Sequence, residues 1–206
     1  MVKDKSLIFK EEILFRLFQK NNFLDELWKN FQILLSLNSQ ENSNLKISNK
    51  SGLLISTHNN NNEFTKSIRS NIQKILNEGD SSTETNVEVV EDSSDMYWLI
   101  LEDHNIYDLL SSSYTTLNAL HSNGSLPNIL ALVLKFEYLI KDNDKSIVNL
   151  IYRTDTKSFY PFIPVSQNPK SRNKDLENNF AQFLQKNKLK IESSKNSWLG
   201  VWGIPF

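Results

Sequence analysis

The sequence predicts an α+β domain: an antiparallel or mixed sheet of about five or six strands with helices packed on one face. Short runs rich in β-branched and aromatic residues alternate with segments whose apolar residues recur at helical spacing. The elements follow the order strand, helix, strand, strand, helix, three strands and helix. The first six have the ferredoxin-like order. A sheet of the type III secretion chaperone kind would use the same elements in a different topology.

The N-terminal part predicts an amphipathic helix, because apolar residues between positions 10 and 37 lie on one stripe. Asn21 and Asn22 are weak helix formers and divide the segment into two helices in one interpretation. The apolar face can pack on this protein's own sheet, or it can bind a partner helix or a membrane surface. Residues 38–50 are polar and without period, which indicates a linker. Residues 1–50 are therefore expected to form a helix and a polar linker.

Residues 51–206 are expected to form a single α+β domain with an aromatic C-terminal tail. Predicted strands and helices follow from alternation, helical spacing and turn residues. The strands are expected at residues 53–55, 87–90, 97–101, 129–138, 147–152 and 158–165, and the helices at residues 64–76, 106–120 and 176–184. Asp103 or Asn105 caps the second of these helices. Pro161 and Pro164 place the last strand at a sheet edge.

Composition excludes several classes of protein. The 206 residues carry 23 Lys and Arg against 24 Asp and Glu, so no global charge favours nucleic acid. The absence of cysteine excludes disulfides and thiolate metal sites. Neither a signal peptide nor an apolar run of about 20 residues is recognisable. We expect a cytoplasmic protein, at most peripheral to a membrane through its N-terminal helix.

No catalytic, metal or cofactor site is predicted. With only 5 glycines, neither a phosphate-binding loop nor a dinucleotide fingerprint can be drawn. The three histidines are isolated. The nearest approach to a cluster is Glu102, Asp103 and His104, between a strand and a helix, where a helix cap is the preferred interpretation. A hydrolase would require all three side chains to point into one cleft.

The unusual feature of the sequence is its clustering of aromatic residues. Bulky residues gather on the predicted edge strand and in the tail, and we take them as candidate partner-binding residues: Phe159, Tyr160, Pro161, Phe162, Trp198, Trp202 and Phe206. The alternative is that they dock on the protein's own core. A second function class is a small-ligand regulatory domain, with a pocket lined by Trp98 and Tyr152.

Six segments, in order, resemble the PspAB family of PspA-associated proteins. They are Trp98–Asp103, the helix that follows, Leu132–Glu137, Phe159–Pro164, Arg172 and Asn173 with Glu177, and Val201–Pro205. The resemblance extends from about Leu53 to the C-terminus. The helix before Leu37 lies outside it, and we expect that helix to be specific to this lineage.

The resemblance implies a non-enzymatic accessory or adaptor protein of the phage-shock, or envelope-stress, response. Proteins of this kind are encoded near PspA or near HtpX-type membrane proteases, so either is an implied partner. The family brings no catalytic residues and no cofactor. The expectation is therefore an adaptor that captures a membrane-stress protein through its aromatic edge.

Overall fold

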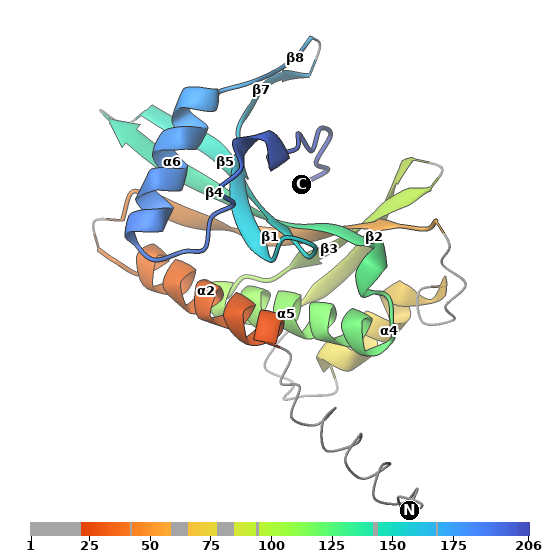
Figure 1. Ribbon diagram of the computed structural model, residues 1–206. Coiled ribbons are helices and arrows are strands. Elements are labelled where there is room, and N and C mark those ends of the chain that lie inside the picture. The colour runs from red at the N-terminus through yellow and green to blue at the C-terminus, as the bar shows by residue number, and fades with distance from the viewer. Residues whose placement is uncertain are drawn as a thin grey trace, which may run out of the picture.

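The computed structural model describes residues 22–41, 43–58, 66–77, 85–93, 95–141, 144–167 and 169–206. These residues form four α-helices, a six-stranded antiparallel sheet and a two-stranded sheet, so the predicted α+β class is confirmed (Figure 1). The helices are α2 (Asn22–Asn38), α4 (Ile68–Asn77), α5 (Ile106–Ser122) and α6 (Lys174–Lys186). The strands are β1 (Leu45–Ser56), β2 (Asn86–Ser93), β3 (Met96–Glu102), β4 (Ile129–Lys141), β5 (Asp144–Arg153), β6 (Ser158–Phe162), β7 (Pro164–Gln167) and β8 (Lys170–Arg172). Two short 3-10 helices complete the set, η1 (Leu126–Asn128) and η2 (Lys195–Ser197).

The large sheet has the strand order β2-β3-β1-β4-β5-β6, with every neighbouring pair antiparallel. Within it, β4, β1, β3 and β2 lie side by side, and α4 and α5 connect β1 to β2 and β3 to β4. This is the split arrangement that the ferredoxin-like element order predicts. Strands β5 and β6 extend the sheet beyond β4, so β2 and β6 are its edges.

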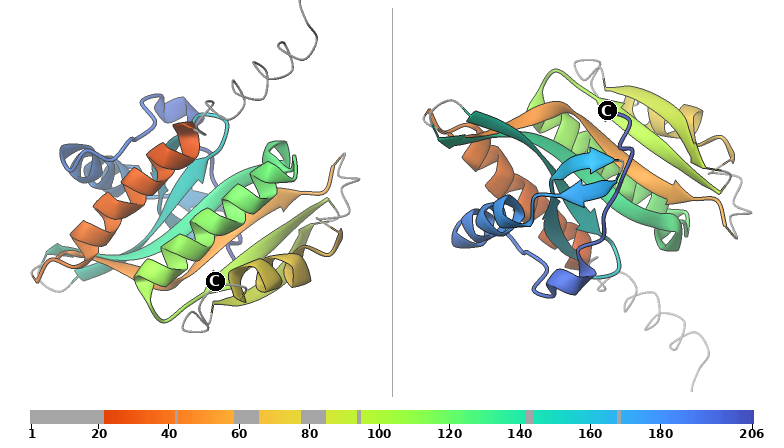
Figure 2. Two further views of the ribbon diagram at one scale, coloured as in Figure 1. Left: turned by 90° about the horizontal axis from the view of Figure 1, so that it is seen from below. Right: turned by 90° about the horizontal axis from the view of Figure 1, so that it is seen from above.

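Helices α2, α4 and α5 lie together on one face of the sheet (Figures 1 and 2). Leu27, Phe31 and Leu34 of α2 are fully buried there, in the larger of two apolar clusters. Helix α6 packs along β6 at the sheet edge. The described part of the N-terminal helix therefore packs on this protein's own sheet, as the first of the two interpretations proposed.

The opposite face of the sheet carries a second apolar cluster with no helix layer above it. Trp98, Val133, Ile151, Tyr160 and Phe162 form its centre. The C-terminal residues lie over this face and cross the strands (Figure 2, right). The sheet is therefore covered on one side by helices and on the other chiefly by irregular chain.

Strand β1 is longer than the sequence indicated, and the predicted linker is wrong in its second half. Leu45 and Ile47 alternate inward and are buried. A register irregularity follows between Ile47 and Ser51, where the strand pairs with β4. The polar run from residue 48 to residue 50 spans this irregularity, which is why it concealed a strand in the sequence.

The predicted strand at residues 158–165 is two strands. It breaks at Ile163, whose backbone N–H donates to Glu177 Oε1 at 2.8 Å. The first piece, β6, is a sheet edge, as its proline predicted. The second, β7, pairs with β8 in a hairpin that sequence reasoning missed. The predicted helix at residues 10–37 is observed from Asn22; its first half and the joint at Asn21 lie outside the described residues.

Candidate functional site

The C-terminal segment from Trp198 to Phe206, here called the tail, has no regular secondary structure. Its three aromatic residues follow one another at four-residue spacing, and each contacts a ring on the sheet. Trp198 stacks on Tyr160 with ring centroids 6.3 Å apart, and Trp202 meets Phe162 edge-on at 4.9 Å. Phe206 meets Trp98 edge-on at 6.0 Å. These contacts carry the tail from β6 across the sheet to β3.

Phe206 rests directly on the backbone of Gly52 in β1. A Cβ atom added to Gly52 would lie 2.4 Å from Cε1 of Phe206 and 3.2 Å from the Trp98 ring. Any side chain at position 52 would therefore push the terminal ring off the sheet. The glycine creates a seat for an aromatic ring at the middle of the sheet.

An ion pair between Arg172 and Glu177 fastens the start of the tail. Arg172 Nε lies 2.8 and 2.9 Å from the two Glu177 oxygens, and the carboxylate is only 2% exposed. The same guanidinium donates to Trp198 O at 2.7 Å and to Pro161 O at 3.3 Å. It also lies over the Phe162 ring, 4.9 Å from the centroid. One side chain thus joins β6, β8, α6 and the tail.

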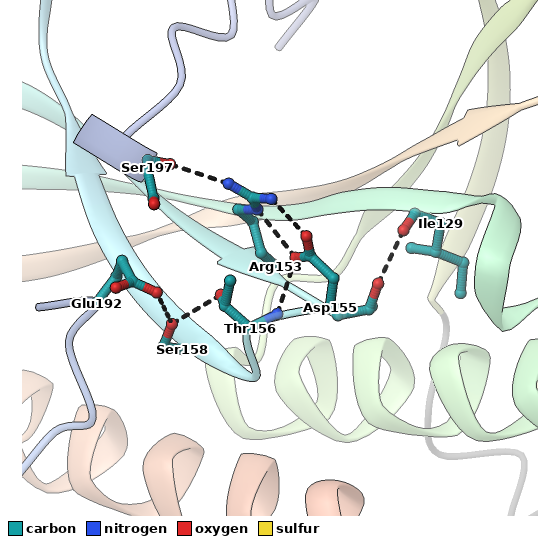
Figure 3. A network of polar contacts seen from close by, with 8 residues as sticks. Ile129, Arg153, Asp155, Thr156, Ser158, Glu192 and Ser197 are labelled. Carbon is teal, nitrogen blue, oxygen red and sulfur yellow. Dashed lines mark hydrogen bonds and ion pairs between the residues drawn. The ribbon is translucent and has the colours of Figure 1, made fainter. Parts of the chain in front are cut away.

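A second set of polar contacts fastens the chain just before the tail (Figure 3). Arg153 donates through Nε to Asp155 Oδ1 at 2.9 Å and through a terminal nitrogen to Ser197 O at 3.0 Å. The hydrogen bond between Arg153 and Asp155 raises the pKa of the guanidinium and lowers that of the carboxyl. Ser158 donates to Glu192 Oε2 at 3.1 Å. The turn after β5 and the segment before the tail are therefore held together.

Between the tail and the sheet lies a cavity of about 680 Å³, here called the tail groove. Trp98 and Tyr160 line it from the sheet, and Leu199 and Trp202 line it from the tail. Leu130 is 43% exposed and Leu199 is 56% exposed, so the groove presents large apolar side chains to solvent. Its size lies within the range of ligand sites in proteins.

Polar groups in and around the groove are few and mostly paired. The indole N–H of Trp98 donates to Asp92 Oδ1 at 3.0 Å. Burial raises the pKa of Tyr160 to about 12, so its phenol is neutral at physiological pH. The groove is suited to binding apolar surface rather than to proton transfer.

Residues 8–206 match the family described as PspA associated protein B, PspAB. The chain belongs to the PspAB family. No curated protein and no solved structure matches the chain. The family match also corrects one expectation: it begins at residue 8, so the N-terminal helix belongs to the family pattern and is not specific to this lineage.

The motif of Arg172, Asn173 and Glu177, on which the family resemblance partly rested, has a structural explanation. Asn173 caps α6 by accepting the Leu176 N–H at 3.0 Å. Glu177 lies on the first turn of that helix, where it meets Arg172. The motif thus starts a helix and fixes the tail at the same point.

The predicted partner-binding residues fall into two groups. Phe159, Tyr160, Pro161 and Phe162 are all buried, because β6 is covered on both sides. Phe159 packs with Tyr152 on the helix side, whereas Tyr160 and Phe162 face the tail. In the tail, Trp198 is buried, and Trp202 and Phe206 are partly exposed.

The pocket predicted between Trp98 and Tyr152 does not form, because the two side chains lie on opposite faces of the sheet. Trp98 lines the tail groove, whereas Tyr152 is buried in the cluster beneath the helices. Strand alternation separates them. Sequence reasoning also missed Leu130 and Leu199 at the groove rim. Leu130 was part of the predicted strand at residues 129–138, and Leu199 followed Trp198 in the tail, so neither had a local signal for a place at the groove.

The corner at Glu102, Asp103 and His104 is a helix start. Asn105 Oδ1 accepts the Tyr107 N–H at 2.9 Å, which confirms one of the two predicted caps. Asp103 is buried and accepts from Thr85 Oγ1 at 2.7 Å, while His104 is exposed. The three side chains do not share a cleft. Within the described ranges, no three His, Asp or Glu residues gather as a metal site.

Proposed function

We propose that this protein is a non-enzymatic accessory protein that binds PspA through the tail groove. The family description supports association with PspA. The observation that carries the choice of surface is the pair of exposed leucines, Leu130 and Leu199, on either side of an aromatic floor. Exposed apolar side chains around buried aromatic rings are typical of protein–protein interfaces.

The aromatic strand β6 has an indirect part in this proposal. Tyr160 is a wall of the groove, and Phe162 supports Trp202 from below. A partner would touch Leu130, Leu199 and Trp202 first, and the β6 rings would fix their positions. Replacing Tyr160 would then weaken binding by deforming the groove.

The proposal is tested by measuring the affinity of purified PspA for the full chain. Leu130→Glu and Leu199→Glu are each expected to weaken binding by about tenfold or more, because a carboxylate would be buried against apolar surface. Tyr107→Glu is the matched control. Tyr107 is 54% exposed and lies on α5, in the helix layer on the opposite face. Equal affinities for all four proteins would refute the groove as the binding surface.

An HtpX-type membrane protease is the alternative protein partner, and the same three variants apply to it. Among the described residues, no helix has the length and apolarity needed to cross a bilayer. We propose that any membrane contact runs through such a partner or through the N-terminal segment.

A small apolar ligand is the second candidate, supported by the volume of about 680 Å³ and the enclosing Trp98 and Trp202. A fragment screen read by thermal shift would identify ligands of this kind. Leu130→Trp, which fills the rim, should abolish every shift that arises in the groove. Shifts that survive this change would place the ligand elsewhere.

A further inference from the structure

The tail and the surface beneath it differ in charge. Residues 199–206 contain no charged side chain. Two lysines nevertheless lie against the tail rings. Lys135 Nζ is 5.1 Å from the Phe206 centroid, and Lys170 Nζ is 5.9 Å from the Trp202 centroid. The side chains of residues 199–206 therefore bring no carboxylate to these two lysines.

Two carboxylates near this surface are paired with other lysines, and a third, Asp92, accepts the Trp98 indole N–H at 3.0 Å. Lys50 pairs with Glu102 at 3.3 Å, and Lys145 pairs with Glu137 at 3.2 Å. Within the part of the chain that the structure describes, neither Lys135 nor Lys170 has a carboxylate within ion-pair distance. Burial, and then the charge of Lys50, lower the pKa of Lys135. An anionic group beside Lys135 would oppose this lowering, because a nearby negative charge favours the charged ammonium.

The tail is attached chiefly by its side chains. Leu199 N–H donates to Ser197 O at 3.0 Å, and beyond it no backbone hydrogen bond joins residues 200–206 to the described sheet. Residues 200–206 are held by ring contacts at Trp202 and Phe206 and by apolar packing of Val201 and Ile204. A segment that offered similar rings and also carboxylates would hold the same sites more tightly.

We propose that the sheet face beneath the end of the tail is a docking site for an acidic partner segment with a bulky aromatic anchor, and that binding displaces residues 203–206 while Leu199 and Trp202 stay at the groove rim. Phe206 fills the ring seat at Gly52 when the partner is absent. The inference rests on the proposed function for the identity of PspA as partner, and it adds the chemistry of the segment that binds. Acidic residues next to the anchor would pair with Lys135 and Lys170.

Two synthetic peptides test the charge requirement on the full chain. Both carry one Phe as the anchor, flanked by Glu residues in one peptide and by Lys residues in the other. Fluorescence anisotropy should show the acidic peptide binding about tenfold tighter or more, because only its carboxylates can pair with Lys135 and Lys170. The double variant Lys135→Glu, Lys170→Glu should remove this preference. Equal affinity of both peptides for the unaltered chain would overturn the proposal.

Two variants test displacement, one in the tail and one in the strand beneath it. Both loosen the tail, but we expect them to change the affinity for the acidic peptide in opposite directions. Phe206→Ala empties the seat and should tighten acidic-peptide binding severalfold. Gly52→Val fills the seat and should abolish it. Circular dichroism checks that each variant is folded. If Gly52→Val does not fold, Gly52→Ala replaces it. A change in the same direction for both types of variant would contradict displacement.

A direct signal of tail release separates this inference from the proposed function. The chain has no cysteine, so an environment-sensitive dye on Pro205→Cys labels the exposed end of the tail alone. The acidic peptide should change the dye signal. If it does so while PspA fails to bind, the docking site stands and PspA is not its partner. If PspA binds without a dye change, the accessory function stands and tail displacement is refuted.

Discussion

Arg172 and Glu177 form a largely buried ion pair, 2.8 Å apart at the closest, at the point where β6, β8, α6 and the tail meet. Each residue of the pair also makes a hydrogen bond to the backbone of another segment. Arg172 holds the Trp198 carbonyl, and Glu177 ends β6 by accepting the Ile163 N–H. The position of the tail over the sheet therefore depends on this pair.

Arg172→Ala should destabilise the fold strongly, by about 3–5 kcal/mol, because it leaves a buried carboxylate without its counter-charge. Urea unfolding measures the effect. Combining Arg172→Met with Glu177→Leu should recover part of the loss, leaving about 1–3 kcal/mol for the unsatisfied Ile163 N–H. A double variant no more stable than Arg172→Ala would show that the ion pair is not the source of the loss.

The contact between Gly52 and Phe206 predicts a non-additive pair of substitutions. Gly52→Ala should destabilise the protein by about 1–3 kcal/mol, because its new methyl group overlaps the Phe206 ring. In a Phe206→Ala background the same change should cost less than about 1 kcal/mol. Thermal or urea unfolding of the four proteins gives the coupling energy. Strict additivity would mean that the ring does not occupy the seat.

The lowered pKa of Lys135 predicts a pH-dependent stability. The folded protein releases this proton more readily than the unfolded chain does, so the penalty for burying the charge is present at neutral pH. It declines as pH rises through the folded-state pKa toward the unfolded value of about 10.4. Lys135→Met should therefore be more stable than the unaltered protein at pH 7, and the difference should narrow as the pH approaches the unfolded-state pKa.

The control for this pH series is Lys145→Met, which removes a lysine that pairs with Glu137 at the surface. It should not stabilise the protein at pH 7. A constant difference between Lys135→Met and the unaltered protein across the pH range would contradict the role given to burial.

The two helix caps, at Asn105 and Asn173, should contribute similar amounts to the free energy of unfolding. Asn105→Ala and Asn173→Ala each remove a side-chain acceptor for an N-terminal N–H, which typically costs about 1 kcal/mol. Only the second should also affect the tail, because Asn173 adjoins Arg172. Tryptophan fluorescence of the folded variants should shift for Asn173→Ala and stay unchanged for Asn105→Ala.

Much of the fold could be predicted because its local signals are strong. The hairpin of β2 and β3, the cap at Asn105 and the edge position marked by Pro161 each follow from short-range preferences. The alternation of side chains between the two faces of a strand also explains the directions of the aromatic rings in β6. The sequence argument that its rings point to two different faces is confirmed by Phe159 and Tyr160, which lie in separate apolar clusters.

The site was harder to predict because it depends on contacts between distant segments. The four-residue spacing of the tail aromatics was visible, but nothing local linked Phe206 to Gly52. The exposed side chains Leu130 and Leu199 acquire a common role only when the tail crosses the sheet. The first half of β1 was missed for a different reason, since its polar run spans a register irregularity.

Photo-crosslinking of PspA from the groove rim tests whether the tail groove is the binding surface. A benzophenone placed on Leu199→Cys, the only cysteine in that variant, should crosslink to purified PspA, and the same label on Tyr107→Cys should not. We expect crosslinks from the groove alone, with PspA bound at the tail groove. Crosslinks from Tyr107 alone would move the interface to the helix layer and contradict it.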